Sequence, residues 1–147
     1  MDPWGVTAAA YLVSLLGAAG GGPACLDLAT LDLHRSAAIS SGSADELTTL
    51  FVDEAAAASE VAVLQQWNGR GLVLESAMLV IGSCVVVDDS GGRVVLEVVD
   101  RLAPTRAIDD VGLSTALPRD DWSRRTVVIQ DVDGQWRYAG GSPATGG

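Results

Sequence analysis

The sequence contains no lysine, and its nine basic residues, all arginine, face 19 aspartates and glutamates. The formal charge of the 147-residue chain is therefore −10, which repels the phosphate backbone of DNA or RNA. The arginines are not gathered with aromatic side chains into the basic patch that is typical of nucleic-acid binding. We therefore expect no nucleic-acid partner.

Cysteine and histidine are too scarce for a common metal site. The chain has two cysteines, Cys25 and Cys84, and one histidine, His34, with no CxxC or Cys/His spacing that fits zinc. We therefore expect no metal. The two cysteines leave a disulfide open but do not indicate one, and we expect them to be separate small apolar side chains in the core.

The short motifs of the common nucleotide, cofactor and hydrolase sites are also missing. The sequence has no P-loop, no GxGxxG between a strand and a helix, and no GxSxG, HExxH or EF-hand spacing. The glycines 20–22 precede Pro23 and lack the lysine of a phosphate loop, so they are typical of a linker. We therefore expect no cofactor.

The remaining composition is that of one globular domain. Hydrophobic residues make up 48% and charged residues 19%, a balance that favours a packed core over disorder. The length allows one such core. We predict an apolar segment and linker over residues 1–24, the domain over 25–140, and a disordered tail over 141–147, which is rich in Gly, Ser and Pro.

The apolar N-terminal segment has two interpretations. No charged side chain occurs between Pro3 and Leu26, a length that matters to a membrane. The segment is rich in Ala and Gly, however, and has Asp2 where an anchor would carry a basic residue. Residues 3–22 are thus either a membrane anchor or an Ala-rich helix that packs on the domain. The localisation is equally open between the cell envelope and the cytoplasm.

Apolar residues at intervals of three and four predict helices in the first half of the chain. One helix covers Leu26 to Ser40 and another begins at Asp53 and ends near Asn68. Ser43 and Glu46 have the S-x-x-E spacing of a capping box, which predicts a short helix between these two.

From Gly71 onward the pattern becomes that of strands. The run Leu72 to Asp88 is too long for one flat strand, so we predict a bend at Gly82. A turn over 88–92 leads to a second strand over 94–99, and a loop excursion over 109–120 follows. Trp122 to Asp131 and Gln135 to Ala139 form the last hairpin around Asp133-Gly134.

This order of elements resembles the NTF2-like domains, the SnoaL and ketosteroid-isomerase-like cone fold. The resemblance rests on the helix end Leu64–Leu72, the strand Val94–Leu102 and the closing Gly134-Gln135-Trp136-Arg137, and it covers roughly residues 26–139. It implies an α+β fold in which N-terminal helices pack on a curved, mainly antiparallel β-sheet around a conical pocket. It also implies a homodimer through the sheet. The arginine-only, Ala- and Gly-rich composition resembles that of actinobacterial proteins.

The candidate site residues lie mainly on the predicted strands. Asp100 and Glu97 are candidate bases, and His34 is the third catalytic candidate. Asp100 and Arg101 are successive, so strand alternation sends them to opposite faces and argues against a direct acid–arginine pair. The candidate pocket-lining residues are aromatic: Trp67, Trp136 and Tyr138.

The order of helices and strands matches the whole fold, but few side chains are suited to catalysis. Tyr11 and Tyr138 are the only tyrosines, which is few for an oxyanion hole built from hydroxyl groups. We therefore expect a non-catalytic binding or assembly domain, tethered at the cell envelope if residues 3–22 are an anchor. The alternative is a small isomerase, cyclase or hydrolase that acts on an apolar small molecule in the cone pocket.

Overall fold

The computed structural model describes residues 22–141 as three helices followed by seven strands. The helices are α2 (Gly22–Ser41), α3 (Ala44–Thr49) and α4 (Glu54–Gly69). The strands are β1 (Val73–Leu74), β2 (Leu79–Asp89), β3 (Arg93–Leu102), β4 (Arg106–Ile108), β5 (Ser114–Ala116), β6 (Ser123–Val132) and β7 (Gln135–Gly141). The expected anchor up to residue 21 and the tail from residue 142 lie outside the described residues. Within 22–141, no helix is both long enough and apolar enough to cross a membrane.

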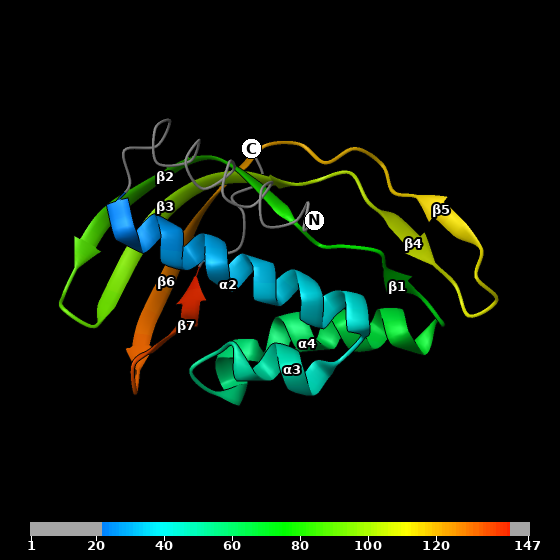
Figure 1. The fold of residues 1–147 in the computed structure, drawn as a ribbon, viewed down its shortest axis with the longest axis horizontal. Coiled ribbons are helices and arrows are strands. Elements are labelled where there is room, and N and C mark those ends of the chain that lie inside the picture. Colours follow the sequence, from blue (N-terminus) through cyan, green and yellow to red (C-terminus); the bar gives the residue numbers. More distant parts are fainter. Residues whose placement is uncertain (1–21, 142–147) are drawn as a thin grey trace, which may run out of the picture.

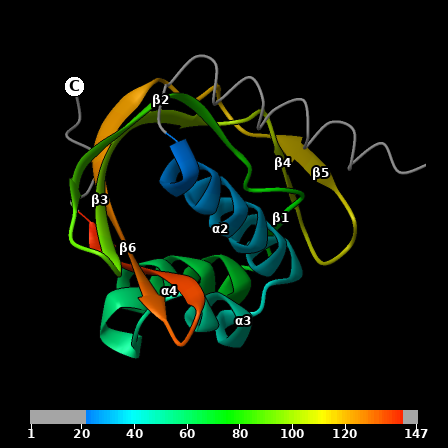
Figure 2. The ribbon, with the colours of Figure 1, turned by 60° about the vertical axis from the view of Figure 1, so that its left-hand side comes forward.

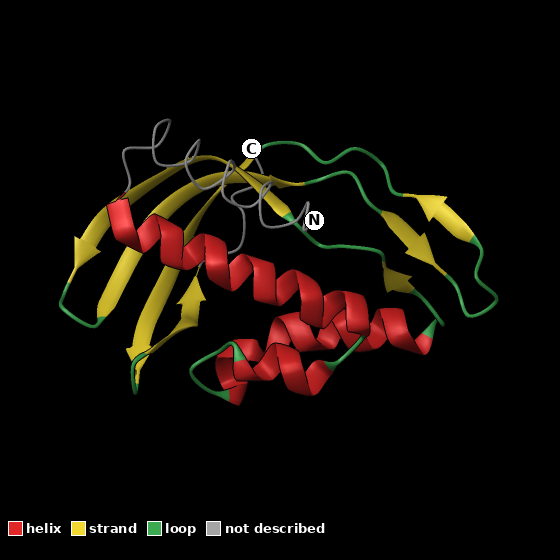
Figure 3. Cartoon of the chain, viewed as in Figure 1, coloured by secondary structure: helices red, strands yellow, loops and turns green. Residues whose placement is uncertain are grey.

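The architecture is a curved antiparallel sheet with helices on its concave face. Strands β2, β3, β6 and β7 form this sheet in that order, and β1, β4 and β5 form a smaller one. Helix α2 runs across the concave face, and α3 and α4 lie together beside its C-terminal half (Figures 1 and 3). Turned by 60°, the larger sheet is seen to curve around α2 (Figure 2). The predicted α+β fold is confirmed.

The prediction of a single strand over Leu72 to Asp88 is wrong. Strand β1 pairs with β4 of the small sheet, whereas β2 pairs with β3 of the large one. Between them, the backbone N–H of Ser76 donates to Thr105 Oγ1 (3.1 Å) and that of Ala77 donates to Ser36 Oγ (2.9 Å). These amides bind side-chain hydroxyls in place of a neighbouring strand, so the ladder is interrupted there.

The bend predicted at Gly82 is confirmed. The register of β2 against β3 shifts between Ile81 and Ser83, which marks a β-bulge. Trp122 packs over this point, and a Cβ atom at Gly82 would lie 3.0 Å from its ring. Glycine is therefore needed at position 82 both for the bend in β2 and to leave room for the ring of Trp122.

The expected loop over 109–120 contains a strand that the sequence did not reveal. Ser114–Ala116 pairs with Arg106–Ile108 as a short hairpin of the small sheet. Three-residue strands are too short to show a period of two, so the pattern gave no signal.

Both predicted helix starts are confirmed by their caps. Ser43 Oγ accepts from the N–H of Glu46 (3.1 Å), and Asp53 Oδ1 accepts from the N–H of Ala56 (2.8 Å). Helix α2 begins at Gly22, so the expected linker around Pro23 is in fact its first turn. Proline is tolerated there because the first helical N–H groups have no intrahelical partner.

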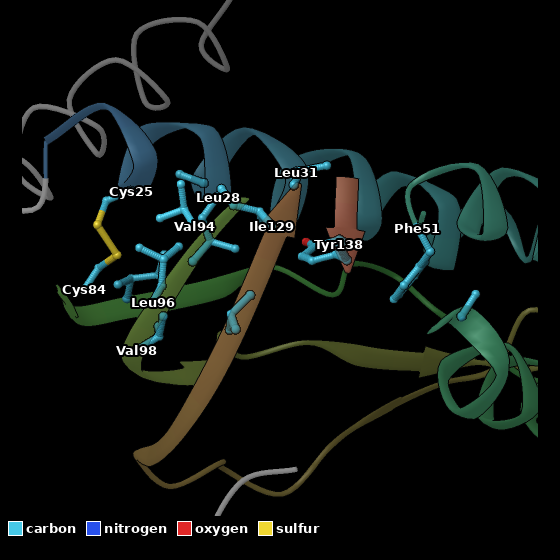
Figure 4. Close-up of a cluster of buried hydrophobic side chains, with 14 of the residues drawn as sticks. Cys25, Leu28, Leu31, Phe51, Cys84, Val94, Leu96, Val98, Ile129 and Tyr138 are labelled. Atoms are coloured by element: carbon cyan, nitrogen blue, oxygen red, sulfur yellow. A yellow bond between two sulfur atoms is a disulfide. The ribbon is translucent and has the colours of Figure 1, made fainter. Parts of the chain in front are cut away.

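The cysteines correct the expectation of two separate apolar side chains. Cys25 and Cys84 form a disulfide, with both residues fully buried and their Cα atoms 6.2 Å apart. The fold joins the first turn of α2 to β2 at this point, across 59 positions of sequence (Figure 4). No local spacing could reveal the bond, because only the packing of α2 on the sheet brings the two cysteines together.

We predict that the disulfide stabilises the domain by about 2–4 kcal/mol, because it closes a long loop in the unfolded chain. Reduction should lower the free energy of urea unfolding by this amount, and the variant Cys25→Ala/Cys84→Ala should show a similar loss. The double variant is its own control, since reductant should leave it unchanged. Equal stability of the oxidised and reduced chains would contradict the prediction.

Candidate functional site

Two adjoining hollows lie between the helices and the sheets. One has a volume of about 380 Å³ and mainly apolar walls, and the other has about 590 Å³ and carries more polar groups. Arg35, Ser59, Glu60 and Leu79 line both. The two spaces therefore meet at these four residues and together form the interior of the cone.

The apolar hollow takes its walls from four parts of the fold. Its aliphatic and aromatic lining residues are Ile39 of α2, Val63, Leu64 and Trp67 of α4, Val73 and Leu74 of β1, and Ala77, Leu79 and Leu102 beside and within the large sheet. The helical spacing that predicts α4 also places Leu64 and Trp67 on the same side of that helix. The small sheet contributes through β1, so both sheets shape this space.

An ion pair between α2 and α4 stands where the hollows meet. Arg35 Nε donates to Glu60 Oε1, and the two side chains are 22% and 32% exposed. Arg35 Nη1 is buried and has no hydrogen-bond partner among residues 22–141. The junction thus carries an ion pair whose opposite charges balance each other.

A second ion pair lines the polar hollow. Arg125 of β6 holds Asp100 of β3 through Nε at 2.9 Å and Nη2 at 2.7 Å, both to Oδ2. Asp100 pairs with Ser123 in the ladder, so Arg125 is its diagonal neighbour two residues along β6. Burial alone would lower the pKa of Arg125, but the hydrogen bond and charge of Asp100 outweigh burial and raise it. Arg125 is therefore held in an ion pair with Asp100 within the polar hollow.

A buried carboxyl lies behind Tyr138, which lines the polar hollow, and sequence reasoning missed this group. Asp32 on α2 is 3% exposed, and its Oδ1 accepts a hydrogen bond from the hydroxyl of Tyr138. Its Oδ2 is buried and has no hydrogen-bond partner in the part of the chain that the structure describes. The available signal was its position one turn after Leu28 on the apolar face of a predicted helix, where a carboxylate is unusual.

Burial controls the titration of this carboxyl. Desolvation raises the pKa of Asp32 from 3.8 to about 6, although the Tyr138 hydrogen bond and the charges of Arg125 and Arg35 oppose the rise. The pKa of Tyr138 is raised well above its ordinary 10, first by burial and then by the charge of Asp32. Asp32 therefore exchanges its proton near neutral pH, whereas Tyr138 stays a hydrogen-bond donor.

Backbone hydrogen bonds fix Tyr138 in this position. Its N–H donates to the carbonyl of Leu50 (2.8 Å), and its carbonyl accepts from the N–H of Val52 (2.9 Å). Its ring packs on Phe51 with the centroids 5.1 Å apart, and Figure 4 shows it below α2 within the buried cluster. The connection between α3 and α4 thus covers the open edge of β7 and holds the tyrosine against the helix.

The structure brings some of the sequence candidates to the hollows. Asp100 and Tyr138 line the polar hollow, and Trp67 lines the apolar one. Trp136 is half-buried and packs against the core cluster, outside the residues that line either hollow. Glu97 is exposed on β3 between inward-facing residues.

The last catalytic candidate, His34, is exposed on α2 and lines neither hollow. Arg101 lines the polar hollow and places its guanidinium 4.6 Å from the ring centre of Trp122, so it does not form the ion pair of its neighbour Asp100. Across residues 22–141, no three His, Cys, Asp or Glu side chains are grouped so that they could hold a metal ion.

The outer face of the large sheet is where the resemblance places a dimer. Val95 and Val99 of β3 are half-buried there, and Glu97 is exposed between them. This face mixes apolar and charged groups in the single chain. The homodimer stays a prediction.

Comparison with known proteins gives similarity in structure alone. No family model matches the sequence, and no curated protein matches it. The intermembrane space region of the chloroplast protein ARC6 has a TM-score of 0.56 at 14% identity, over 80% of this chain and 92% of that one. A variant of the Mycobacterium tuberculosis protein Rv3472, whose function is unknown, has a TM-score of 0.51 at 12% identity, over 80% and 72%.

A third solved structure is similar at a lower TM-score. It is an NTF2-like protein with a cystatin-like fold from Novosphingobium aromaticivorans, with a TM-score of 0.47 at 13% identity, over 95% of this chain and 87% of that one. Identities this low say nothing about activity. The helices on the concave side of a curved antiparallel sheet, together with the similarity to the ARC6 region and to Rv3472, show the expected α+β cone fold.

Proposed function

We propose that the domain is a non-catalytic binding module for a small, uncharged and mainly apolar molecule held in the two hollows. The observation that carries the proposal is the apolar hollow of about 380 Å³, which adjoins a polar one with balanced charges. Small-molecule sites typically measure roughly 300–1,000 Å³ and combine apolar walls with a few polar groups. The hollow between α2, α4 and β1 has this character.

The charges of the site support an uncharged ligand. Arg35 is neutralised by Glu60, and Arg125 by Asp100. A charged ligand would have to separate one of these partly buried pairs and leave a charge without its partner. A neutral ligand instead leaves both ion pairs intact.

The disulfide supports a site of action outside the cytoplasm. Cys25 and Cys84 are joined in the core, and such bonds persist mainly in oxidising compartments. This agrees with the envelope side of the two expected localisations. If the domain acts in an oxidising compartment, its folding stability should rely on the disulfide. A comparison of the oxidised and reduced chains measures this contribution.

The substitution Trp67→Ala should weaken binding of an uncharged apolar probe, because it removes the largest apolar wall of the hollow. For N-phenyl-1-naphthylamine, followed by fluorescence titration, we expect Kd to rise about tenfold, or about 1.4 kcal/mol. The matched control is Trp122→Ala, because Trp122 is 48% exposed and packs outside on Gly82. An equal effect of both substitutions would mean that the probe binds elsewhere.

A second candidate function is proton transfer at Asp32. The specific observation is a buried carboxyl with a pKa of about 6, one free oxygen and a hydrogen bond to Tyr138. Tyr138 lines the polar hollow, so a proton from a bound molecule can pass to its oxygen while its own proton passes to Asp32. This candidate keeps the same ligand class and adds a reaction.

Deuterium exchange separates these two functions. If Asp32 transfers protons, the domain in D₂O should label the carbon next to the carbonyl group in some members of a panel of apolar ketones, as read by NMR. Asp32→Asn keeps the size and the acceptor for Tyr138 but should reduce labelling about a hundredfold or more, as is typical for loss of a general base. Labelling that survives in the variant, or none above solvent background with the native chain, would leave binding as the only function.

Asp32 should also make folding stability depend on pH. Its pKa in the fold is about 6 against 3.8 in the unfolded chain, so its contribution is most favourable below pH 3.8 and is lost as the pH rises to 6. Asp32→Asn removes this loss, so its stability relative to the native chain should increase from pH 4 to pH 7 by up to about 3 kcal/mol. Urea unfolding at four pH values measures the difference. A difference that is constant with pH would show that Asp32 has an ordinary pKa.

A further inference from the structure

A strip of three valines is exposed along the free edge of the large sheet. Val85, Val86 and Val87 of β2 are 50%, 36% and 53% exposed. Strand β2 is the first in the order β2-β3-β6-β7, so one side of it has no neighbouring strand within the described residues. An exposed apolar edge of this kind promotes association with another strand or chain unless something covers it. We call these three residues the valine strip.

The chain that precedes α2 starts next to the valine strip. Helix α2 begins at Gly22, and Cys25 in its first turn is bonded to Cys84, the residue immediately before Val85. The disulfide therefore holds the end of the N-terminal segment beside the strip. Figure 4 shows the bond joining the start of the helix to β2.

We propose that residues 3–21 of the same chain cover the valine strip. This segment has no charged side chain, and its larger apolar residues are Trp4, Val6, Leu12, Val13, Leu15 and Leu16. Nineteen residues are far more than is needed to reach a strip that begins beside their attachment point. A tethered segment also acts at a high effective concentration, on the order of millimolar, so few contacts are needed to hold it.

The charges near the attachment point favour this occupant over a lipid surface. Asp2 precedes the segment, Asp88 and Asp89 follow the strip, and the first basic residue in the sequence is Arg35. Anionic membranes attract basic flanks and repel acidic ones, so these neighbours oppose a membrane-bound arrangement.

The size of the strip argues against a second copy of the chain. Stable interfaces bury roughly 800 Å² on each partner, which involves about 20–30 residues. Three partly exposed valines supply only a small part of such an area, whereas a tethered segment needs no large interface.

Hydrogen exchange of the full-length chain, read by mass spectrometry, tests the proposal in both directions. The variant Leu12→Asp/Leu15→Asp should speed exchange over residues 84–90 by about tenfold, because the strip loses its cover. The variant Val85→Arg/Val87→Arg should speed exchange over residues 6–16 to a similar degree. The strip positions are exposed, so this variant keeps the core and the disulfide.

The matched control is Val111→Arg/Leu113→Arg. These residues are 84% and 65% exposed near the turn between β4 and β5, in the other sheet, so the exchange of both regions should stay unchanged. Unchanged exchange over residues 6–16 in the strip variant would overturn the proposal. Exchange protection of the valine strip that increases with protein concentration would also overturn the proposal, because it indicates a second copy of the chain. A third contradicting result is flotation of the protein with phosphatidylcholine and phosphatidylglycerol vesicles that is lost in the Leu12→Asp/Leu15→Asp variant.

Discussion

The packing of helix α2 into the concave face of the sheet is the contact on which the other features depend. Its first turn is bonded to β2 through Cys25, and its middle meets β7 where Asp32 accepts from Tyr138. Its second half carries Arg35 and Ile39, which line the hollows. A disulfide, a buried hydrogen bond and part of the wall of the two hollows therefore follow one another along a single helix.

The charged side chains that line the hollows include two ion pairs, whereas Asp32 has no cationic partner in direct contact. The arginine–carboxylate pairs balance charge at the junction and in the polar hollow, as partly buried ions require. Asp32 has only a phenol as its direct partner and one oxygen with none. A buried polar atom without a hydrogen-bond partner is unusual in a native core. Asp32 is therefore the interior group whose presence folding stability explains least.

Much of the fold could be predicted from the sequence, because helices, caps and long strands leave local patterns. The start at Asp53 and the bend at Gly82 are two examples, each set by the chemistry of one residue. The disulfide, the break before Ala77 and the pairing of Asp32 with Tyr138 depend on residues far apart in sequence. Such contacts exist only after the layers have packed, and a single sequence carries no periodic signal for them.

The short break between β1 and β2 separates the small sheet from the large one, and the two sheets contribute to different parts of the interior. The large sheet holds the core, whereas the small one touches the apolar hollow through β1. Hydrogen bonds from Ser76 to Thr105 and from Ala77 to Ser36 join the two regions. Substitutions at Val73 and Leu74 of β1 can therefore reshape the apolar hollow without repacking the core cluster, which contains neither residue. The size of the hollow and the stability of the core can thus vary independently of each other in this fold.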